Sequence, residues 1–577
     1  MLETTHIEVD DGLLADWRGR VALARAHLGW EPALPLVARR HGAGASLAIA
    51  APMDQLFTAT EVNEWALCTS VHARDPDRWR ELEPALQVAA MEQAADPAAI
   101  DPPVLEVQAA FSRLRRLADA ERRPDLLAVV ADAAAHGVRH IVDEEQLTLG
   151  AGAGSRSWLL EALPASDAVP WPQLRDIPVA AVTGSNGKTT TVRLVAACAR
   201  AQGWHDGFCC TDGVFVANEL ADPGDYSGPA GTRRVLRDTR LEAAVLEMAR
   251  GGILRRGLAT DRADVAVVTN VSNDHFGEYG IDDLDGLADA KLTVAHLVTR
   301  HGMLVLNADD DVLRRKAASL PERLCGAVPA LGWFALDWER QELREHRKRD
   351  GATAGVRGGR LHLAWHGREH DLGAVDAMPL TLQGHARYNV ANLAGAALAA
   401  AALGVPPVTI AGVFARFGLD PADNPGRLVR FVAAGAQVLV DYAHNPDGLR
   451  GVLQVARALR GPGGRLIVLL GHAGNRRDED LVEVAQVAAS FNPGLVVVKE
   501  DEAHLRGRRP GEVPELLRRA LLAAGLSPAT VMLRMTELDA ARCALQAART
   551  GDAVALLVHS GAAREAVLAL LQDRTGG

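Results

Sequence analysis

The stretch AVTGSNGKTTTVRL at residues 181–194 decides how the rest of this chain is interpreted. An apolar run at 178–182 comes first, and a helical pattern ends the stretch. Between them lie Gly184, Ser185, Asn186, Gly187, Lys188, Thr189 and Thr190. Small residues let backbone N–H groups close around phosphate oxygens, and the positive end of a following helix attracts the same oxygens. A standard P-loop has Gly six residues before its Lys, where this chain has Val182. The stretch predicts a variant phosphate-binding loop, with an ordinary turn as the alternative.

The size and charge of the chain limit its function. Its 577 residues allow roughly three to four domains of about 150 residues each. Apolar residues make up 48% and charged residues 23%, which is typical of globular proteins. A net charge of −11 disfavours a general nucleic-acid binder. Small-molecule partners are therefore expected.

Cysteine spacing and hydropathy predict a cytoplasmic protein without a membrane span. The six cysteines form no C-x-x-C pair, so reduced thiols are expected rather than a zinc site. The acidic N-terminal sequence MLETTHIEVDDG does not resemble a signal peptide. An apolar run at 393–415 is interrupted by Pro406-Pro407, whereas a membrane span needs about 20 unbroken apolar residues. Two buried elements joined by a turn are expected there.

The pattern of strands and helices predicts an α/β protein with three domains, at residues 1–172, 173–425 and 426–577. In the first domain, helical patterns at 103–117 and 124–135 stand between short apolar strands at 47–50 and 141–142. This N-terminal α/β domain is a candidate for binding an acceptor substrate. The Gly-rich sequence GAGAG at 150–154 resembles a dinucleotide-binding loop only superficially. Because it leads into the sequence SRSW at 155–158 and not into a Gly-ended turn, it suggests a flexible connector.

The two later domains alternate strands with helices. Apolar runs at 243–247, 265–271 and 303–307 predict a mostly parallel central sheet that is covered on both faces. The more polar segment at 340–380 reads as a surface excursion with a strand-like run at 360–365. The last domain has five apolar runs, at 437–440, 465–470, 494–498, 530–532 and 553–558. They predict an open, Rossmann-like α/β domain.

Three residues downstream of the phosphate loop are candidates for binding metal. Glu247 ends an apolar strand, where a carboxylate next to a P-loop can ligate Mg²⁺. His275 ends the sequence TNVSNDH, which follows another strand, and could bind a second metal ion or a phosphate oxygen. Lys291 lies on an expected helix and could carry CO₂ as a carbamate. The alternatives are a plain strand end, a turn and a surface lysine.

Six motifs in order carry a family resemblance. They are TGSNGKTT, Glu247, N-x-x-x-D-H at 270–275, G-H-A-R-Y-N-x-x-N at 384–392, Gly426-Arg427, and the sequence DYAHNP at 441–446. Together they resemble the Mur ligase superfamily, over residues 173–577. Within it, the stretches at 211–213, 247–255, 475–480 and 505–512 are most similar to the Mur-like half of cyanophycin synthetases. That resemblance implies a central P-loop ATPase domain, a C-terminal Rossmann-like ligase domain and a homodimer.

The resemblance also implies an ATP-dependent amide ligase that forms an acyl phosphate and releases ADP. In such an enzyme Lys188 contacts the β- and γ-phosphates, while Thr189 and Glu247 bind a first Mg²⁺. His275 and a carbamylated Lys291 serve a second metal ion. The catalytic set implied by the family comprises Lys188, Glu247, His275, Lys291 and Arg427.

The later motifs imply a nucleotide held between two domains. By the same resemblance, Asn389 and Asn392 lie near adenine and Arg427 near the γ-phosphate. Asp441 is placed at the ribose, and His444 lies close to the nucleotide. Closure of the domains would exclude water, which would otherwise hydrolyse an acyl phosphate.

The acceptor and the incoming amino acid stay open. Cyanophycin synthetases carry an ATP-grasp half in front of their Mur-like half, and about 170 residues before the loop are too few for it. Candidate substrate contacts are Arg250 and the charged loop Arg476, Arg477 and Asp478, which could equally be solvated. An amino-acid or peptide acceptor leads, ahead of a cell-wall nucleotide or a folate-like one. The alternative function is a nucleotide-binding scaffold that has lost ligation.

Overall fold

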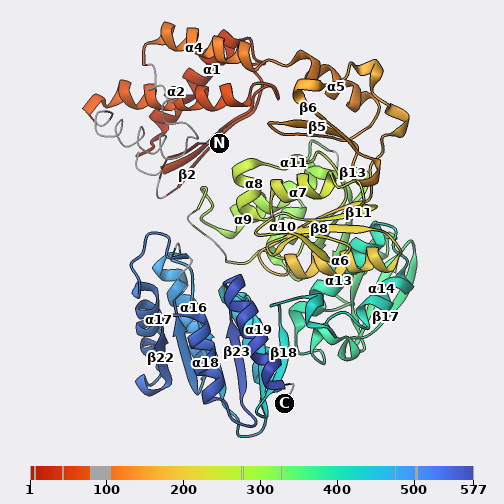
Figure 1. Cartoon of the computed structure of the whole chain (residues 1–577), viewed down its shortest axis with the longest axis vertical. Helices are drawn as coiled ribbons and strands as arrows, with labels where there is room; N and C mark the ends of the chain where they lie inside the picture. Colours follow the sequence, from red (N-terminus) through yellow and green to blue (C-terminus); the bar gives the residue numbers. More distant parts are fainter. Residues whose placement is uncertain are drawn as a thin grey trace.

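A computed structural model describes residues 2–4, 8–41, 44–77, 79, 105–273, 276, 278–326, 328–474, 476–500 and 504–575. Within these ranges the chain forms four β-sheets. The N-terminal region, the central region and the C-terminal region follow one another along the long axis of the molecule (Figure 1).

The central sheet has eleven strands, in the order β10-β9-β8-β11-β7-β12-β13-β14-β15-β16-β17. Its middle is parallel, which confirms the expected α/β class. The parallel strands are β7 (Val179–Thr183), β8 (Asp206–Cys210), β11 (Ala243–Glu247), β12 (Ala263–Val268), β13 (Val298–Asn307), β14 (Ala330–Phe334) and β15 (Ala352–Arg357). The antiparallel edges are β9 (Gly213–Val216) and β10 (Glu219–Pro223) on one side, and β16 (Arg360–Trp365) and β17 (Arg368–Ala374) on the other.

Helices cover both faces of this sheet. Strand β7 is apolar throughout because Val179 and Ala181 pack into one core while Ala180 and Val182 pack into the other. One face carries α7 (Pro229–Leu236), α8 (Arg250–Arg256), α9 (Leu284–Lys291), α10 (Asp311–Ala317), α11 (Leu320–Arg323) and α12 (Gln341–Arg347). The other carries α6 (Lys188–Ala201), α13 (Arg387–Ala402) and α14 (Pro407–Phe414). The two helices α13 and α14 confirm the interpretation of the apolar run at 393–415.

The segment at 340–380 corrects a prediction. It is no surface excursion, because β15, β16 and β17 extend the central sheet at its edge. Leu361 and Leu363 on β16 are fully buried in the core that α13 and α14 complete. The polar residues around them made the segment look irregular, although a strand that packs one face on a core needs apolar side chains only at every second position.

The C-terminal region forms a six-stranded sheet in the order β18-β19-β23-β20-β21-β22. Its strands are β18 (Val429–Ala433), β19 (Ala436–Asp441), β20 (Leu466–Leu470), β21 (Leu495–Lys499), β22 (Val531–Arg534) and β23 (Ala553–Leu557). Five of them overlap the five predicted strands, and β18 adds an antiparallel edge. Helices α15 (Pro446–Leu459), α16 (Asp478–Ser490) and α17 (Glu512–Ala523) cover one face, and α18 (Glu537–Ala547) and α19 (Gly561–Thr575) the other.

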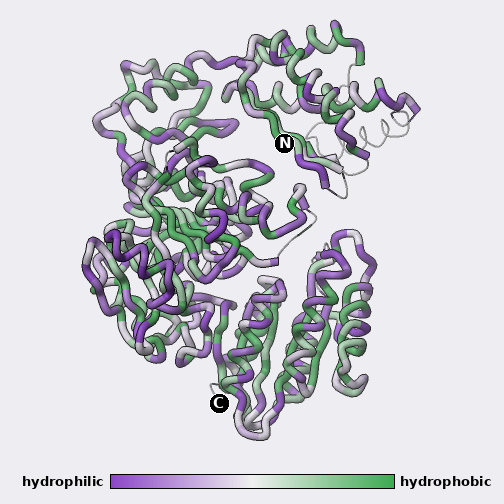
Figure 2. Tube along the Cα trace, turned by 180° about the vertical axis from the view of Figure 1, so that it is seen from behind, coloured by the Kyte–Doolittle hydropathy of each residue, from purple (hydrophilic) through white to green (hydrophobic). Residues whose placement is uncertain are grey.

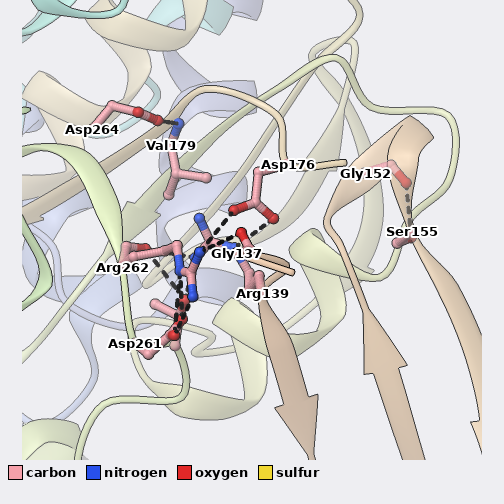
Figure 3. Close-up of polar contacts among 10 residues, drawn as sticks. Gly137, Arg139, Gly152, Ser155, Asp176, Val179, Asp261, Arg262 and Asp264 are labelled. Atoms are coloured by element: carbon pink, nitrogen blue, oxygen red, sulfur yellow. Dashed lines mark hydrogen bonds and ion pairs between the residues drawn. The ribbon is translucent and has the colours of Figure 1, made fainter. Parts of the chain in front are cut away.

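The N-terminal region holds two separate cores. The first contains β1 (Leu2–Thr4), β2 (Leu36–His41), β3 (Gly44–Ile49), α1 (Asp11–Leu28), α2 (Leu56–Arg74) and α4 (Val107–Glu121). The second contains α5 (Pro124–Ala135), β4 (His140–Val142), β5 (Gln146–Leu149) and β6 (Arg156–Leu159). The second is joined to the central region by Arg139, which is buried and contacts Asp176 and the carbonyl of Arg262 (Figure 3).

The GAGAG sequence is a fixed junction and not the flexible connector that its composition suggested. The N–H of Ala153 donates to the carbonyl of Leu241 at 2.7 Å, and that of Ala151 to Arg175 at 3.1 Å. Gly152 has φ +54°, and a Cβ there would lie 2.4 Å from the Leu241 carbonyl oxygen. Glycine is therefore needed because two backbones approach closely.

Hydropathy follows this layered arrangement. Hydrophobic residues concentrate along the strands of the central sheet (Figure 2). Among the described residues, none of the helices combines the length and the apolar character that crossing a bilayer requires.

Candidate active site

The phosphate loop joins β7 to α6, and two of its glycines are required by close contacts. Gly184 has φ +149°, and a Cβ there would lie 1.8 Å from the hydroxyl oxygen of Thr269. Gly187 has φ +81°, and a Cβ there would lie 2.2 Å from the side-chain oxygen of Asn392. Larger residues would push the loop away from both neighbours. The loop is thus seated between the tip of β12 and helix α13.

The loop after β12 braces the phosphate loop. The N–H of Ser185 donates to the backbone carbonyl of Asn270 at 2.9 Å, and the N–H of Asn186 to the Asn270 side-chain oxygen at 2.9 Å. The hydroxyl of Thr269 donates to the Asn186 carbonyl at 2.6 Å. The Lys188 ammonium donates to the Ser185 carbonyl at 3.1 Å. These bonds fix the conformation of the loop, which is the kind of preorganisation that phosphate sites use.

Glu247 lies at the carboxyl end of β11 and is fully buried. Its two carboxylate oxygens accept hydrogen bonds from the Thr189 hydroxyl at 2.8 Å and the Thr211 hydroxyl at 3.1 Å. Burial raises the pKa of Glu247, and the nearby Lys188 ammonium opposes that shift. A carboxylate and two hydroxyls form an oxygen-only donor set, which Mg²⁺ prefers.

The opposite side of the site comes from the C-terminal region. The guanidinium carbon of Arg427 lies 4.3 Å from the centre of the Tyr442 ring. Asp441 ends β19, and its carboxylate accepts the N–H of Ala443 at 2.7 Å. Burial raises the pKa of Asp441 to about 6, while Arg427 acts in the opposite direction. This side therefore offers one cation and one buried carboxyl group.

One cavity of about 370 Å³ brings the two sides together. The predicted residues that line it are Ser185, Asn186, Gly187, Lys188, Thr189, Thr190, Glu247, Asn389, Asn392, Arg427, Asp441 and His444. Gly184 directly precedes this set. Other residues that line the cavity were not predicted from the sequence as site residues. They include Thr211, Asn307, Asp309, Asp310, Tyr388, Tyr442 and Asp447. Thr211, Tyr388 and Tyr442 lie within quoted motifs, which was the available signal.

Direct contacts join the two regions around the cavity. The side-chain amides of Asn186 and Asn445 exchange two hydrogen bonds, at 3.0 and 3.2 Å. The amide of Asn424, in the segment that leads into the C-terminal sheet, donates to the Thr190 hydroxyl at 3.1 Å. The Asn273 amide donates to the Glu483 carboxylate at 2.9 Å. The structure is therefore a closed arrangement, with the phosphate loop facing the C-terminal sheet.

Comparison with family models identifies both regions. Residues 182–400 match the Mur ligase middle domain, and residues 426–558 match the glutamate ligase domain of Mur ligases. Together these matches cover more than half of the chain. The chain belongs to the Mur ligase family. Its membership of a family of ATP-dependent amide ligases is thereby confirmed.

Individual relatives match this chain only in part. It is 36% identical over 345 residues to the cyanophycin synthetase of Nostoc sp. (strain PCC 7120 / SAG 25.82 / UTEX 2576), covering 60% of this chain and 37% of that one. It is 30% identical over 334 residues to the UDP-N-acetylmuramoyl-L-alanyl-D-glutamate–2,6-diaminopimelate ligase of Chlorobium phaeobacteroides, covering 56% and 61%. E. coli FolC in complex with DHPP and ADP has a TM-score of 0.49 at 20% identity, covering 69% of this chain and 89% of FolC. The match thus spans little more than a third of the length of the cyanophycin synthetases.

The remaining candidate residues lie elsewhere or outside the described residues. His275 lies outside the described residues. Lys291 is buried at the end of α9 and is not among the described residues that line the cavity. Arg250 opens α8 and pairs with Glu278. Helices α8 and α9 cover the same face of the central sheet.

The charged loop at 476–478 lies on the C-terminal region. Arg476 is buried and lines a small hollow together with Asn273 and His444. Arg477 pairs with Asp480 at 2.9 Å. Asp478 pairs with Arg508 at 2.7 Å. The loop therefore adjoins the main cavity through His444, which lines both.

The raised pKa of Asp441 predicts a pH-dependent stability. Between its ordinary pKa of 3.8 and the folded value of about 6, the folded carboxyl keeps a proton that the unfolded chain has lost. The free energy of unfolding therefore falls as the pH rises through this window, by about 3 kcal/mol. Asp441→Asn cannot ionise, so its stability relative to the parent should rise by that amount from pH 4 to pH 7. Urea denaturation without nucleotide measures this. Asp539→Asn, which removes an exposed carboxylate on α18, is the control, and an equally flat difference for both variants would contradict the prediction.

Proposed function

We propose that this chain is an ATP-dependent, ADP-forming carboxylate–amine ligase that works through an acyl phosphate. One observation carries the proposal: the phosphate loop and the DYAHNP motif line the same cavity. The two motifs are far apart in the sequence, since Asn186 and Asn445 are separated by 259 residues. In this proposal Lys188 and Arg427 contact the phosphates from opposite sides. Asn389, Asn392, Asp441 and His444 surround the nucleoside.

The proposed reaction has two steps. A substrate carboxylate oxygen attacks the γ-phosphorus of ATP, the bond to the β-phosphate oxygen breaks, and ADP leaves. The amine nitrogen then attacks the acyl carbon, the carbon–oxygen bond to phosphate breaks, and the nitrogen loses a proton. Inorganic phosphate is the second product. Because charge spreads over the phosphoryl oxygens, fixed cations such as Lys188 and Arg427 are the groups that this step needs.

Magnesium is part of the proposal because the donor set fits it. Glu247 and Thr189 would hold the ion, since their oxygens adjoin each other next to the phosphate loop. When bound, the ion would neutralise charge on the phosphate oxygens. A second metal position near His275 and a carbamylated Lys291 stays a prediction.

The proposed substrates are an amino acid and an amino-acid or peptide acceptor related to cyanophycin. Similarity to the cyanophycin synthetases over 60% of this chain supports that class. The N-terminal region, which precedes both family matches, is the proposed place of acceptor binding. The proposed setting is the cytoplasm, and the proposed assembly is a homodimer.

Amine-dependent product release tests the proposal. Purified protein is incubated with Mg²⁺ and ATP, and a panel of amino acids and short peptides supplies carboxylates and amines. The expected result is release of ADP and phosphate in equal amounts, only when both substrates are present. Nucleotide binding without turnover across a broad panel would instead favour the scaffold that has lost ligation.

A further inference from the structure

Asp212 is a buried carboxylate that faces three arginines. Its side chain is 9% exposed, and it lies in the turn between β8 and β9. Its oxygens lie 2.8 Å from Arg564, 3.5 Å from Arg193 and 3.9 Å from Arg427. Each of these distances is within reach of an ion pair. One carboxylate thus serves several cations at once.

The three arginines come from both sides of the closed cavity. Arg193 lies on α6, the helix that the phosphate loop opens, and its guanidinium lies 4.6 Å from the ring of Phe215. Arg427 and Arg564 belong to the C-terminal region, Arg564 on α19. Asp212 and Arg193 therefore form a fixed part of the central region. Arg427 and Arg564 can meet it only when the two regions approach each other.

The neighbouring residue links this cluster to the phosphate site. Thr211 holds Glu247, the carboxylate proposed to bind magnesium. Burial alone would raise the pKa of Asp212, but Arg427 and then Arg564 and Arg193 lower it overall, so the group stays ionised. A charged acceptor that bonds several cations in a buried place is costly to leave unpaired. Opening the two regions would expose it to water instead.

We propose that Asp212 is a positioning residue that aims Arg427 into the cavity and, through Arg564, couples that placement to closure of the C-terminal region. The inference rests on the proposed function because it assigns Arg427 to the nucleotide phosphates. Asp212 itself does not line the cavity among its described residues, so it acts through Arg427. Loss of Asp212 should weaken nucleotide binding without removing any group that touches the nucleotide.

The variant Asp212→Asn tests this in the full chain. We expect its KM for ATP and its calorimetric Kd for Mg-ATP to rise by about tenfold, with kcat reduced less. Scattering with saturating Mg-ATP should give a larger radius of gyration than the parent protein has. The matched control is Asp222→Asn, which removes an ion pair with Arg234 at 2.8 Å within the same region. The control should leave all three quantities at the parent values.

Double variants separate positioning from simple stability. In the background Arg564→Met, the Asp212→Asn change should have a smaller effect on KM, because the coupled partner is already absent. Arg564→Lys should restore much of the parent KM. Additive effects, or a KM in Asp212→Asn equal to that of Asp222→Asn, would overturn the inference. The two proposals fail differently: if the parent protein binds Mg-ATP but does not ligate, the proposed function fails, and a tenfold Kd effect would still support the positioning role.

Discussion

Lys188→Ala should lower kcat/KM for ATP by about a thousandfold or more, with the fold intact. Lys188 opens α6 and lines the cavity, and its ammonium lies 3.1 Å from the Ser185 carbonyl within the phosphate loop. A fixed cation there stabilises charge that builds up on the phosphoryl oxygens, and groups of this kind are worth about 10²–10³ in rate or more. Steady-state kinetics of ADP release measures the loss.

A surface lysine supplies the control for this variant. Lys348 is 69% exposed and pairs with Glu345, so Lys348→Ala removes the same charge far from the loop. It should leave kcat/KM unchanged. Lys188→Arg keeps the charge but should stay strongly impaired, because a planar guanidinium does not match an ammonium in a closed loop. Substantial turnover by Lys188→Ala with a normal melting temperature would contradict the assignment.

The phosphate loop could be predicted from the sequence because its information is local. Two glycines, a lysine and a threonine within a few residues specify the turn and the helix start. The contacts that make Gly184 and Gly187 necessary are not local. They involve Thr269 and Asn392, whose positions depend on the packing of β12 and α13. The sequence motif therefore predicted the loop but not its surroundings.

The pairing of distant residues could not be predicted for the same physical reason. Asn186 meets Asn445 across 259 residues, and Asp212 meets Arg564 across 352. No periodicity or spacing encodes such contacts, since they follow from how two sheets approach. Resemblance to a family supplied the expectation of a shared nucleotide site, and the residue pairs came from the structure.

Composition gave a wrong structural expectation in two places, because the small or polar residues there are needed for packing. Residues 150–154 look flexible because they are small, yet Gly152 is small because the Leu241 carbonyl lies against it. The segment of β15 to β17 looked like a surface excursion because polar residues surround its strand-like run at 360–365. Leu361 and Leu363 are buried in that run, and the segment extends the central sheet.

Glu247→Gln should lower the activity strongly while leaving the melting temperature unchanged or higher. The amide keeps the size of the carboxyl group and can still accept a hydrogen bond from Thr189 or Thr211, so the local geometry persists. Burial raises the pKa of Glu247, which means that the ionised form is disfavoured in the folded chain at neutral pH. Removing the charge should therefore leave the melting temperature unchanged or higher. The proposed magnesium ligand is lost, so kcat should fall by about a hundredfold or more and the Mg²⁺ concentration for half-maximal rate should rise.

The control distinguishes this effect from a general loss of charge near β11. Glu242 lies just before the strand, is exposed and accepts the N–H of His205 at 2.9 Å. Glu242→Gln should retain the parent rate and the parent Mg²⁺ dependence. Kinetics across a magnesium titration and thermal denaturation at pH 7 give both readouts for each variant. A Glu247→Gln protein that melts several degrees below the parent would contradict the prediction, because it would show that the carboxylate stabilises the fold. Normal turnover by Glu247→Gln at the Mg²⁺ concentration that the parent requires would show that Glu247 is not a metal ligand, whatever the stability of the variant.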